Sequence, residues 1–225
     1  MSDRVIAITG GHGVLGRAVL EAAVAEGLGV AVIDHARGRS VPDGVLELAA
    51  VDLTDGAAAD RAVSAVIERF GRLDALLNIA GGFVWQTTDD AEPAWDRMYA
   101  LNVKTALNAA RAALPALKRS DEGRIVNVGA AGALKSAAGM GAYAAAKSGV
   151  HRLTESLAEE LKSTSVTVNA VLPSILDTEQ NRMDMPDADP ATWVQPADLA
   201  RVILFLASPE SRAMTGALIP VTGRV

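Results

Sequence analysis

The sequence contains no cysteine. Disulfide bonds, thiol catalysis and cysteine-ligated zinc are therefore excluded. Its three histidines, His12, His35 and His151, are far apart in the chain, and none belongs to an H-x-x-x-H or H-E-x-x-H motif. We therefore expect no metal site.

Positive charge is also scarce, because 21 Lys and Arg residues stand against 27 Asp and Glu residues and leave a net charge of −6. No basic cluster is long enough to follow a phosphate backbone or an anionic membrane surface. Long hydrophobic runs are lacking too, so neither a signal-peptide core nor a membrane span is predicted. We expect a cytoplasmic protein that binds a small-molecule substrate, with no nucleic acid and no membrane as partner.

Apolar residues, in contrast, make up 50% of the 225 residues. Short apolar runs that end at small or polar residues alternate with segments of helical composition. This alternation predicts an α/β fold in one domain over residues 1–225, a single doubly wound Rossmann-type parallel sheet with helices on both faces. The predicted strands are 4–9, 29–33, 45–51, 73–79, 124–128, 166–172 and 217–221, and the predicted helices are 17–26, 56–70, 95–118, 141–162 and 197–207.

The first predicted strand is followed by Gly10, and glycine recurs at positions 13 and 16, before the first predicted helix. Without Cβ atoms such a turn is tight, and its backbone can approach a pyrophosphate at the helix N-terminus. A strand, a glycine turn and a helix in this order indicate a dinucleotide site. We expect it to be formed by Gly10, His12, Gly13, Val14, Leu15 and Gly16.

The second predicted strand ends at Asp34. A carboxylate at this place accepts hydrogen bonds from the adenosine ribose hydroxyls and repels a 2′-phosphate, which favours NAD(H). Arg37 and Arg39 follow closely and leave NADP(H) possible. The alternative is that Asp34 is only a solvated turn residue.

Tyr143 and Lys147 lie four residues apart in the predicted helix 141–162, so both should lie on one face. An ammonium group beside a phenol favours the phenolate and lowers the tyrosine pKa toward neutrality. Such a tyrosine exchanges a proton at cellular pH. The alternative is that Tyr143 covers an apolar patch while Lys147 is solvated.

Together these motifs resemble the short-chain dehydrogenase/reductase family over nearly the whole chain. The resemblance implies that Tyr143 donates a proton, that Lys147 holds the nicotinamide ribose and lowers the tyrosine pKa, and that Asn102 anchors a water of the proton relay. It implies further cofactor contacts. The residues that carry the resemblance beside these three are Thr9-Gly10, Gly13, Gly16, Asp52-Leu53 at the adenine, Asn78-Ile79-Ala80-Gly81, Pro173, and Thr178 near the carboxamide.

Two positions depart from the family pattern. The family usually has glycine at position 14, where this chain has Val14 and a glycine one place earlier. The family also usually has a serine thirteen residues before the tyrosine, where this chain has Ala130. Losing one donor to a developing oxyanion costs about 2.7–4 kcal/mol. We therefore expect an activated acceptor that needs this donor less. Ser136 or a water is the alternative source of the hydrogen bond.

One branch of the family, dihydropteridine reductase, lacks the serine in the same way. The chain resembles this branch at Ala80-Gly81-Gly82, at Gly139-Met140 and over residues 171–189. The resemblance implies an NADH-dependent reductase of a quinonoid dihydropterin or a similar flat, electron-poor acceptor. The alternatives are a general carbonyl reductase or alcohol dehydrogenase, and a non-catalytic NAD(H)-sensing module.

The polar segment 174–195 suits a substrate lid. Its Trp193, Met183 and Met185 either contact a flat substrate or anchor the lid to the body of the protein. Alanine-rich helices around Asn102 and Tyr143 permit close packing between subunits, and the family resemblance implies a homodimer or homotetramer. Alternatively, the alanines pack on the sheet.

Overall fold

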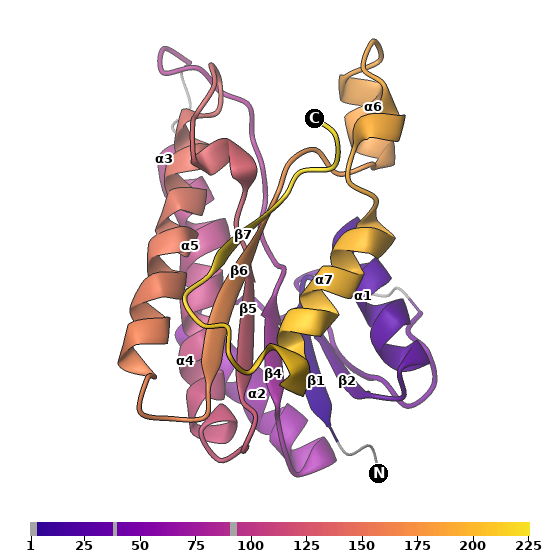
Figure 1. The fold of residues 1–225 in the computed structure, drawn as a ribbon, viewed down its shortest axis with the longest axis vertical. Coiled ribbons are helices and arrows are strands. Elements are labelled where there is room, and N and C mark those ends of the chain that lie inside the picture. The colour runs from indigo at the N-terminus through magenta and orange to yellow at the C-terminus, as the bar shows by residue number, and fades with distance from the viewer. Residues whose placement is uncertain (1–3, 38–39, 91–93) are drawn as a thin grey trace.

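A computed structural model describes residues 4–37, 40–90 and 94–225, which build a parallel sheet between two layers of helices (Figure 1). Seven strands lie in the order β3-β2-β1-β4-β5-β6-β7. The predicted α/β fold is thus confirmed. The strands are β1 (Val5–Thr9), β2 (Gly29–Ile33), β3 (Leu46–Leu48), β4 (Ala75–Asn78), β5 (Arg124–Val128), β6 (Thr167–Pro173) and β7 (Leu218–Val221).

The strand order reverses direction between β1 and β4. The chain starts at β1, moves outward to β3, and returns to β4 on the other side of β1. In sheets of this kind a crevice opens outside the carboxyl ends of the strands at the reversal, and ligands bind there. The fold therefore places a candidate site above Thr9 and Asn78, the last residues of β1 and β4.

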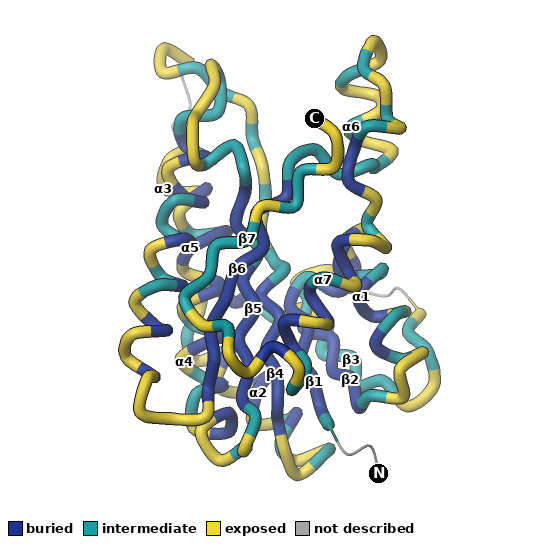
Figure 2. Tube along the Cα trace, viewed as in Figure 1, coloured by how far each residue is buried: buried dark blue, intermediate teal, exposed yellow. Residues whose placement is uncertain are grey.

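Two helical layers bury the sheet. Its strands β1, β2 and β4 consist entirely of buried residues, as Figure 2 shows, which explains why they read as continuous apolar runs. One layer contains α1 (Val14–Ala25) and α7 (Pro196–Ala207), and the other contains α2 (Gly56–Phe70), α4 (Thr105–Leu117) and α5 (Gly141–Glu160). Among the described residues, no helix has the length and apolarity that crossing a membrane requires.

The structure differs from the predicted element bounds in two places near the glycine turn. Only Leu46–Leu48 of the predicted strand 45–51 is extended. This strand lies at the edge of the sheet, and Ala50 leaves the extended region with a φ of 58°. The first helix begins at Val14, three residues before the predicted start, so the glycine turn runs directly into the helix.

The predicted helix 95–118 consists of three parts. A short helix, α3 (Ala94–Tyr99), continues through a π-helical turn at Ala100–Lys104 into α4. Within the turn, the N–H of Thr105 donates to the carbonyl of Ala100, five residues earlier. Such turns are rare and are often found at functional sites.

The segment 174–195 contains a short helix, α6 (Glu179–Asp184), and a 3₁₀ turn at Pro190–Thr192. A parallel bridge between Leu176 and Val194 closes its base. Trp193 is only 4% exposed, so it anchors the segment to the body of the protein, which is one of the two predicted alternatives. Met183 on α6, in contrast, is 63% exposed.

A buried carboxylate fixes the opposite end of the sheet. Asp74, directly before β4, is 1% exposed and accepts hydrogen bonds from the N–H of Val5, from Arg72 and from the hydroxyl of Ser120 at 2.7–2.8 Å. Burial by itself raises the pKa of Asp74, but these hydrogen bonds outweigh it and the pKa lies below the ordinary value of 3.8. The ionised carboxylate therefore stabilises the fold.

We predict that Asp74→Asn lowers the free energy of unfolding by about 2 kcal/mol at neutral pH, because charge-assisted hydrogen bonds are lost. The stabilisation by Asp74 is complete above its unfolded-state pKa and is lost as the pH falls through the lower folded-state pKa. Urea unfolding at pH values on either side of this window should show the difference shrinking with acidification. The matched control is Asp121→Asn, at an exposed neighbouring position. A difference that does not depend on pH would contradict the prediction.

Candidate active site

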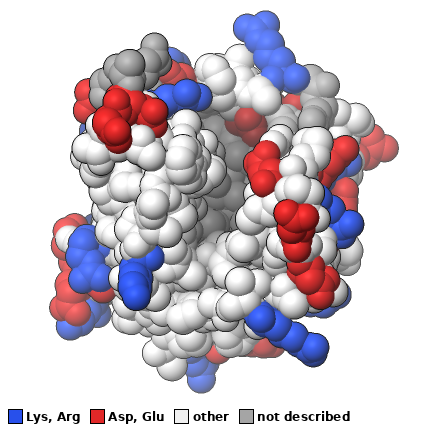
Figure 3. All heavy atoms as spheres, turned by 90° about the horizontal axis from the view of Figure 1, so that it is seen from above, with Lys and Arg blue, Asp and Glu red and all other residues white. Residues whose placement is uncertain are grey.

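A cleft of about 490 Å³ opens at the carboxyl ends of β1, β2, β4 and β5. Ligand sites commonly measure roughly 300–1,000 Å³. Figure 3 shows this end of the molecule hollowed, with charged side chains mostly around the rim. The cleft is lined by eleven of the residues predicted for the site, namely Gly10, Gly13, Val14, Leu15, Gly16, Asp34, Leu53, Ala80, Gly81, Tyr143 and Lys147.

The turn between β1 and α1 is closely packed. Gly10 has a φ of +70°, and a Cβ on it would lie 2.8 Å from the backbone of Ala80. A Cβ on Gly16 would lie 2.1 Å from the carbonyl oxygen of Gly10. Only glycine fits at these two places, because the φ value and the space exclude a side chain at Gly10 and the space alone excludes one at Gly16.

Gly13 and Val14 form the open side of this turn. Both are exposed, and Gly13 is the N-cap residue of α1 without any side chain to cap the first N–H groups. A Cβ on Gly13 would meet only the carbonyl oxygen of Gly10, at an ordinary 3.4 Å. The helix N-terminus thus presents free N–H groups and its positive dipole end to the cleft, which fits a diphosphate.

Asp34 lies at the end of β2 beside this turn. One carboxylate oxygen accepts a hydrogen bond from the N–H of His12 at 2.9 Å and the other from the N–H of Ala36 at 2.8 Å. The carboxylate therefore has a fixed position in the cleft wall, unlike a freely solvated turn residue. Arg37 is exposed, and Arg39 lies outside the described residues.

The imidazole of His12 does not line the cleft. Its ring is buried, and Nε2 lies 2.8 Å from a carboxylate oxygen of Glu47 on β3. The backbone of His12 holds Asp34, while its side chain ties the turn to the edge strand. His12, predicted as part of the dinucleotide site, thus belongs to the turn but does not line the cleft.

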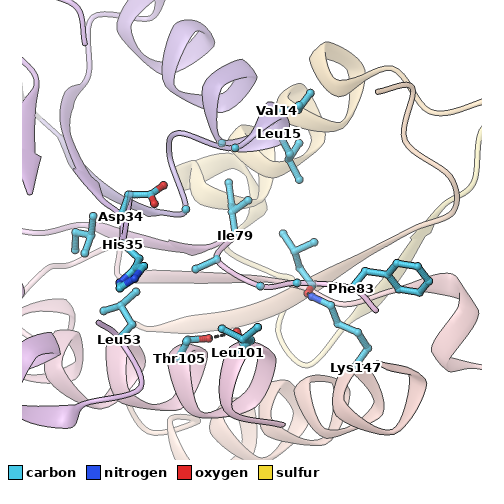
Figure 4. Close-up of a pocket in the computed structure, with 18 of the residues that line it drawn as sticks. Val14, Leu15, Asp34, His35, Leu53, Ile79, Phe83, Leu101, Thr105 and Lys147 are labelled. Carbon is cyan, nitrogen blue, oxygen red and sulfur yellow. Dashed lines mark hydrogen bonds between the residues drawn. The ribbon is translucent and has the colours of Figure 1, made fainter. Parts of the chain in front are cut away.

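At the end of the cleft beside Asp34, Leu53 lines the cleft but Asp52, also predicted to lie at the adenine, does not. The carboxylate of Asp52 accepts hydrogen bonds from the hydroxyl and the N–H of Thr54, which lower its pKa. His35 and Val51 line this end as well, although no motif in the sequence marked them. Figure 4 shows Asp34 and His35 at one end of the cleft, with Phe83 and Lys147 at the other.

Asn78 lies beneath the cleft floor. Its amide donates to Asn127 on β5 at 2.9 Å, and Asn127 donates to the hydroxyl of Thr154 on α5 at 2.9 Å. This buried chain of hydrogen bonds joins two strands to α5. The loop after β4 is fixed from the other side, because the hydroxyl of Thr9 accepts from the N–H groups of Ile79 and Ala80.

Tyr143 and Lys147 both line the cleft from one face of α5, as their spacing predicted. The lysine is only 6% exposed. Its Nζ donates to the carbonyl oxygen of Val128 at 2.7 Å and lies 6.0 Å from the centre of the tyrosine ring. Lys147 is therefore neither solvated nor bonded to the phenol; it binds the end of β5.

The predicted lowering of the Tyr143 pKa is wrong for this geometry. Burial raises the pKa of Tyr143 to about 12. Burial also lowers the pKa of Lys147 to about 8. The expectation failed because it considered only the spacing along the helix, whereas burial disfavours both charged forms. Tyr143 keeps its proton at neutral pH, as a proton donor must.

Asn102 lies in the π-helical turn and is 1% exposed. Its amide donates to the carbonyls of Gly82 and Met98, and its oxygen accepts from the N–H of Gly82. A Cβ on Gly81 would lie 2.6 Å from the Asn102 oxygen and 3.3 Å from the nitrogen of Lys147. Asn102 thus holds the loop after β4 close to Lys147 without lining the cleft itself.

The position of the usual serine offers no hydroxyl. Ala130 is buried, and Ser136 is exposed and donates to the carbonyl of Ala137. Ser136 does not line the cleft, so the prediction that it could replace the serine is not supported by its position. The hydroxyl of Ser148, on α5, is also engaged, because it donates to the carbonyl of Ala133.

The last two predicted cofactor contacts lie near the cleft but do not line it. Pro173 ends β6, and the hydroxyl of Thr178 caps α6 by accepting from the N–H of Asn181 at 3.1 Å. Leu176, between them, does line the cleft. The sequence also gave no signal for Phe83, whose ring lies 5.0 Å from that of Tyr143 in an edge-to-face arrangement.

Comparisons with known proteins match almost the whole chain. A family model described as short chain dehydrogenase matches residues 4–189. The 2-(S)-hydroxypropyl-CoM dehydrogenase 3 of Xanthobacter autotrophicus is 32% identical over 246 residues, covering 99% of this chain and 96% of that protein. The 3-oxoacyl-(acyl-carrier-protein) reductase MabA of Mycobacterium bovis is 32% identical over 233 residues, covering 98% and 92%. The crystal structure of 3-ketoacyl-(acyl-carrier-protein) reductase from Brucella melitensis complexed with NADH has a TM-score of 0.87 and 27% identity, covering 99% of this chain and 98% of that one.

The glycine turn yields a paired prediction. Gly16→Ala should destabilise the protein by about 1–3 kcal/mol, because its Cβ collides with backbone. Gly13→Ala should fold like the wild type but bind NADH more weakly, because its methyl group enters open space above the helix N-terminus. Urea unfolding and titration of NADH fluorescence measure the two effects. Equal stability of Gly16→Ala and wild type, or unchanged NADH affinity of Gly13→Ala, would each refute its half of the prediction.

Proposed function

The chain belongs to the short-chain dehydrogenase family, and on this premise we propose that it is an NAD(P)H-dependent reductase with Tyr143 as proton donor. The observation that carries the proposal is the meeting of a glycine turn, a fixed carboxylate and the Tyr143 and Lys147 pair in one cleft. The nicotinamide, when bound, supplies a hydride. The residues of the chain bind and orient the reactants and supply the proton.

Different groups along the cleft bind the cofactor and donate the proton. The N-terminus of α1 fits the diphosphate, and Lys147 is placed to hold the nicotinamide ribose. Tyr143 donates its phenolic proton to the acceptor heteroatom on which negative charge develops when the hydride adds to a neighbouring atom, and the ammonium of Lys147 on the same face stabilises the phenolate that remains. Asn102 positions the loop at Gly81 and Gly82, which borders this end.

We further propose that NADH is preferred over NADPH. The carboxylate of Asp34, held by two backbone N–H groups, suits a ribose with free hydroxyls and repels a 2′-phosphate. The relative from Brucella melitensis complexed with NADH supports a nicotinamide cofactor but not this preference. Exposed Arg37 leaves NADPH as a slower substrate.

The proposed acceptor is a quinonoid dihydropterin or a similar flat, electron-poor ring. No hydroxyl lies at Ala130, and the hydroxyls of Ser136 and Ser148 donate to carbonyls elsewhere. An acceptor that spreads the incoming charge over ring nitrogens depends less on such a donor. Phe83, 57% exposed beside Tyr143, offers an aromatic surface to a planar ring.

A second candidate is a general carbonyl reductase or alcohol dehydrogenase. The names of two relatives favour it, since one is an oxoacyl reductase and the other a hydroxypropyl dehydrogenase. In that case a water would take the place of the missing serine hydroxyl at the carbonyl oxygen.

One assay distinguishes these activities. The absorbance of NADH or NADPH is followed with purified protein against quinonoid dihydropterin, simple quinones and a panel of ketones. Turnover of the flat acceptors with NADH supports the proposal, and turnover of ketones alone favours the second candidate. Binding of NADH without turnover of any acceptor would instead indicate a non-catalytic sensing module.

For cellular context, we propose that the protein acts in the cytoplasm as a homodimer or homotetramer. The alanines on one side of α4 do not contribute to this, because Ala106, Ala109, Ala110 and Ala113 are buried within the subunit. An interface along this helix would instead use exposed residues such as Leu107, which is 40% exposed.

Tyr143→Phe removes only the hydroxyl that donates the proton. We expect the rate constant kcat to fall by at least about 10²-fold, the usual effect of general acid catalysis, while the affinity for NADH is retained. Tyr99→Phe is the matched control, because Tyr99 is 51% exposed on α3. Steady-state kinetics and NADH titration provide both values. Activity near that of the wild type would exclude Tyr143 as the proton donor.

Ala130→Ser restores the usual donor. We expect kcat/KM for ketones to rise by about tenfold or more, because a well-placed oxyanion donor is worth roughly 10²–10³ in rate. The rate with flat, electron-poor acceptors should change little. Ala131→Ser, one residue further along, is the control. An unchanged ketone rate would show that the missing hydroxyl does not determine the choice of acceptor.

A further inference from the structure

The end of β5 is held by two successive turns of α5. Lys147 donates from Nζ to the carbonyl oxygen of Val128 at 2.7 Å. One helical turn later, Nε2 of His151 accepts a hydrogen bond from the N–H of Ala130 at 3.3 Å. Between them, the N–H of Gly129 donates to Val171 on β6 at 2.9 Å. Three consecutive backbone groups beside the cleft are thus bound by side chains of α5 and by β6.

The ring of His151 is part of the interior and is only 2% exposed. It reaches the backbone because position 129 is glycine, where a Cβ would lie 2.5 Å from Nε2. Ala130 is itself 4% exposed, so water does not reach its N–H readily. A buried N–H needs a partner, and the imidazole provides one.

This hydrogen bond requires one protonation state. Nε2 accepts only when it carries a lone pair, so the ring is neutral with its proton on Nδ1. A protonated ring would present an N–H to another N–H and would break the bond. The pKa of His151 is lowered by burial and then by the positive charges of Arg152 and Lys147, which keeps the ring neutral at physiological pH. These two cations belong to its own helix, while β5 and β6 bring uncharged Gly129 and Leu172 to this place.

We propose that His151 is a positioning residue, whose neutral ring holds residues 128–130 so that the cleft wall at Val128 and the anchor of Lys147 keep their working geometry. Both Val128 and Lys147 line the cleft. Protonation of the ring releases this segment, so activity falls on acidification. The catalytic part rests on the proposed function, whereas the hydrogen bond and its pH dependence do not.

The test compares pH profiles of kcat/KM for the wild type, His151→Gln and His151→Leu. Glutamine brings an acceptor oxygen to a similar distance and does not titrate in this range. We expect the wild type to lose activity on the acid side with an apparent pKa below 6.5, the ordinary value for histidine. His151→Gln should lack this loss and match the wild type at neutral pH. His151→Leu should lose about tenfold or more in kcat at every pH, because the segment is misplaced.

Arg152→Gln is the matched control, since the Arg152 side chain is 70% exposed and leaves the ring in place. It should retain both the neutral-pH activity and the acid-side loss. If His151→Gln keeps the acid-side loss of the wild type, the proposal is wrong. Should His151→Leu fail to fold, the comparison of His151→Gln with the wild type still decides.

Two measurements decide the matter without turnover. In nuclear magnetic resonance spectra, the Ala130 amide should titrate with the same pKa as the His151 ring, and this titration should be absent in His151→Gln. The stability of the wild type relative to His151→Gln should fall as the pH drops from 6.5 through the lower folded-state pKa, because the neutral ring stabilises the fold only above that range. An Ala130 amide that does not follow the ring would overturn the proposal even if no acceptor were reduced.

Discussion

The hydrogen bond from Lys147 to the carbonyl of Val128 joins α5, which carries Tyr143, to the strand β5 that borders the cleft. A buried ammonium is costly unless it is paired or hydrogen-bonded, and the lowered pKa of Lys147 reports that cost. The bond ties α5 to the end of β5. Tyr143 lies one helical turn before Lys147 and lines the cleft, and His151 lies one turn after it and accepts a hydrogen bond from Ala130.

The cleft depends on close backbone contacts as much as on side chains. Gly10 packs against the backbone of Ala80, Gly16 packs against Gly10, and Gly81 lies between Asn102 and Lys147. Beneath them the hydrogen bonds from Asn78 to Asn127 and from Asn127 to Thr154 join β4, β5 and α5. Such a network in a low-dielectric interior favours one arrangement of the strands over alternatives. The site is therefore rigid in its floor and walls.

Much of the fold could be predicted from the sequence, because strands buried on both faces appear as continuous apolar runs, as in β2. The pairing of Tyr143 with Lys147 on one face followed from helical spacing alone. The edge strand β3 was predicted too long, since no second neighbour extends its ladder. The π-helical turn escaped prediction because no sequence pattern marks it; its Asn102 bonds locally to Met98 and over a longer range to Gly82. The pKa of Tyr143 depends on burial, which spacing does not reveal, and Phe83 and His151 belong to no motif.

The bridge between Leu176 and Val194 determines which part of the segment 174–195 is held at the cleft. The bridge joins the two ends of the segment 174–195, and buried Trp193 anchors it to the body of the protein. Between these two ends lie the six residues of α6, whereas Leu176 lines the cleft. The base of the segment is therefore part of the cleft wall, whereas α6 projects beyond it, as Figure 1 shows.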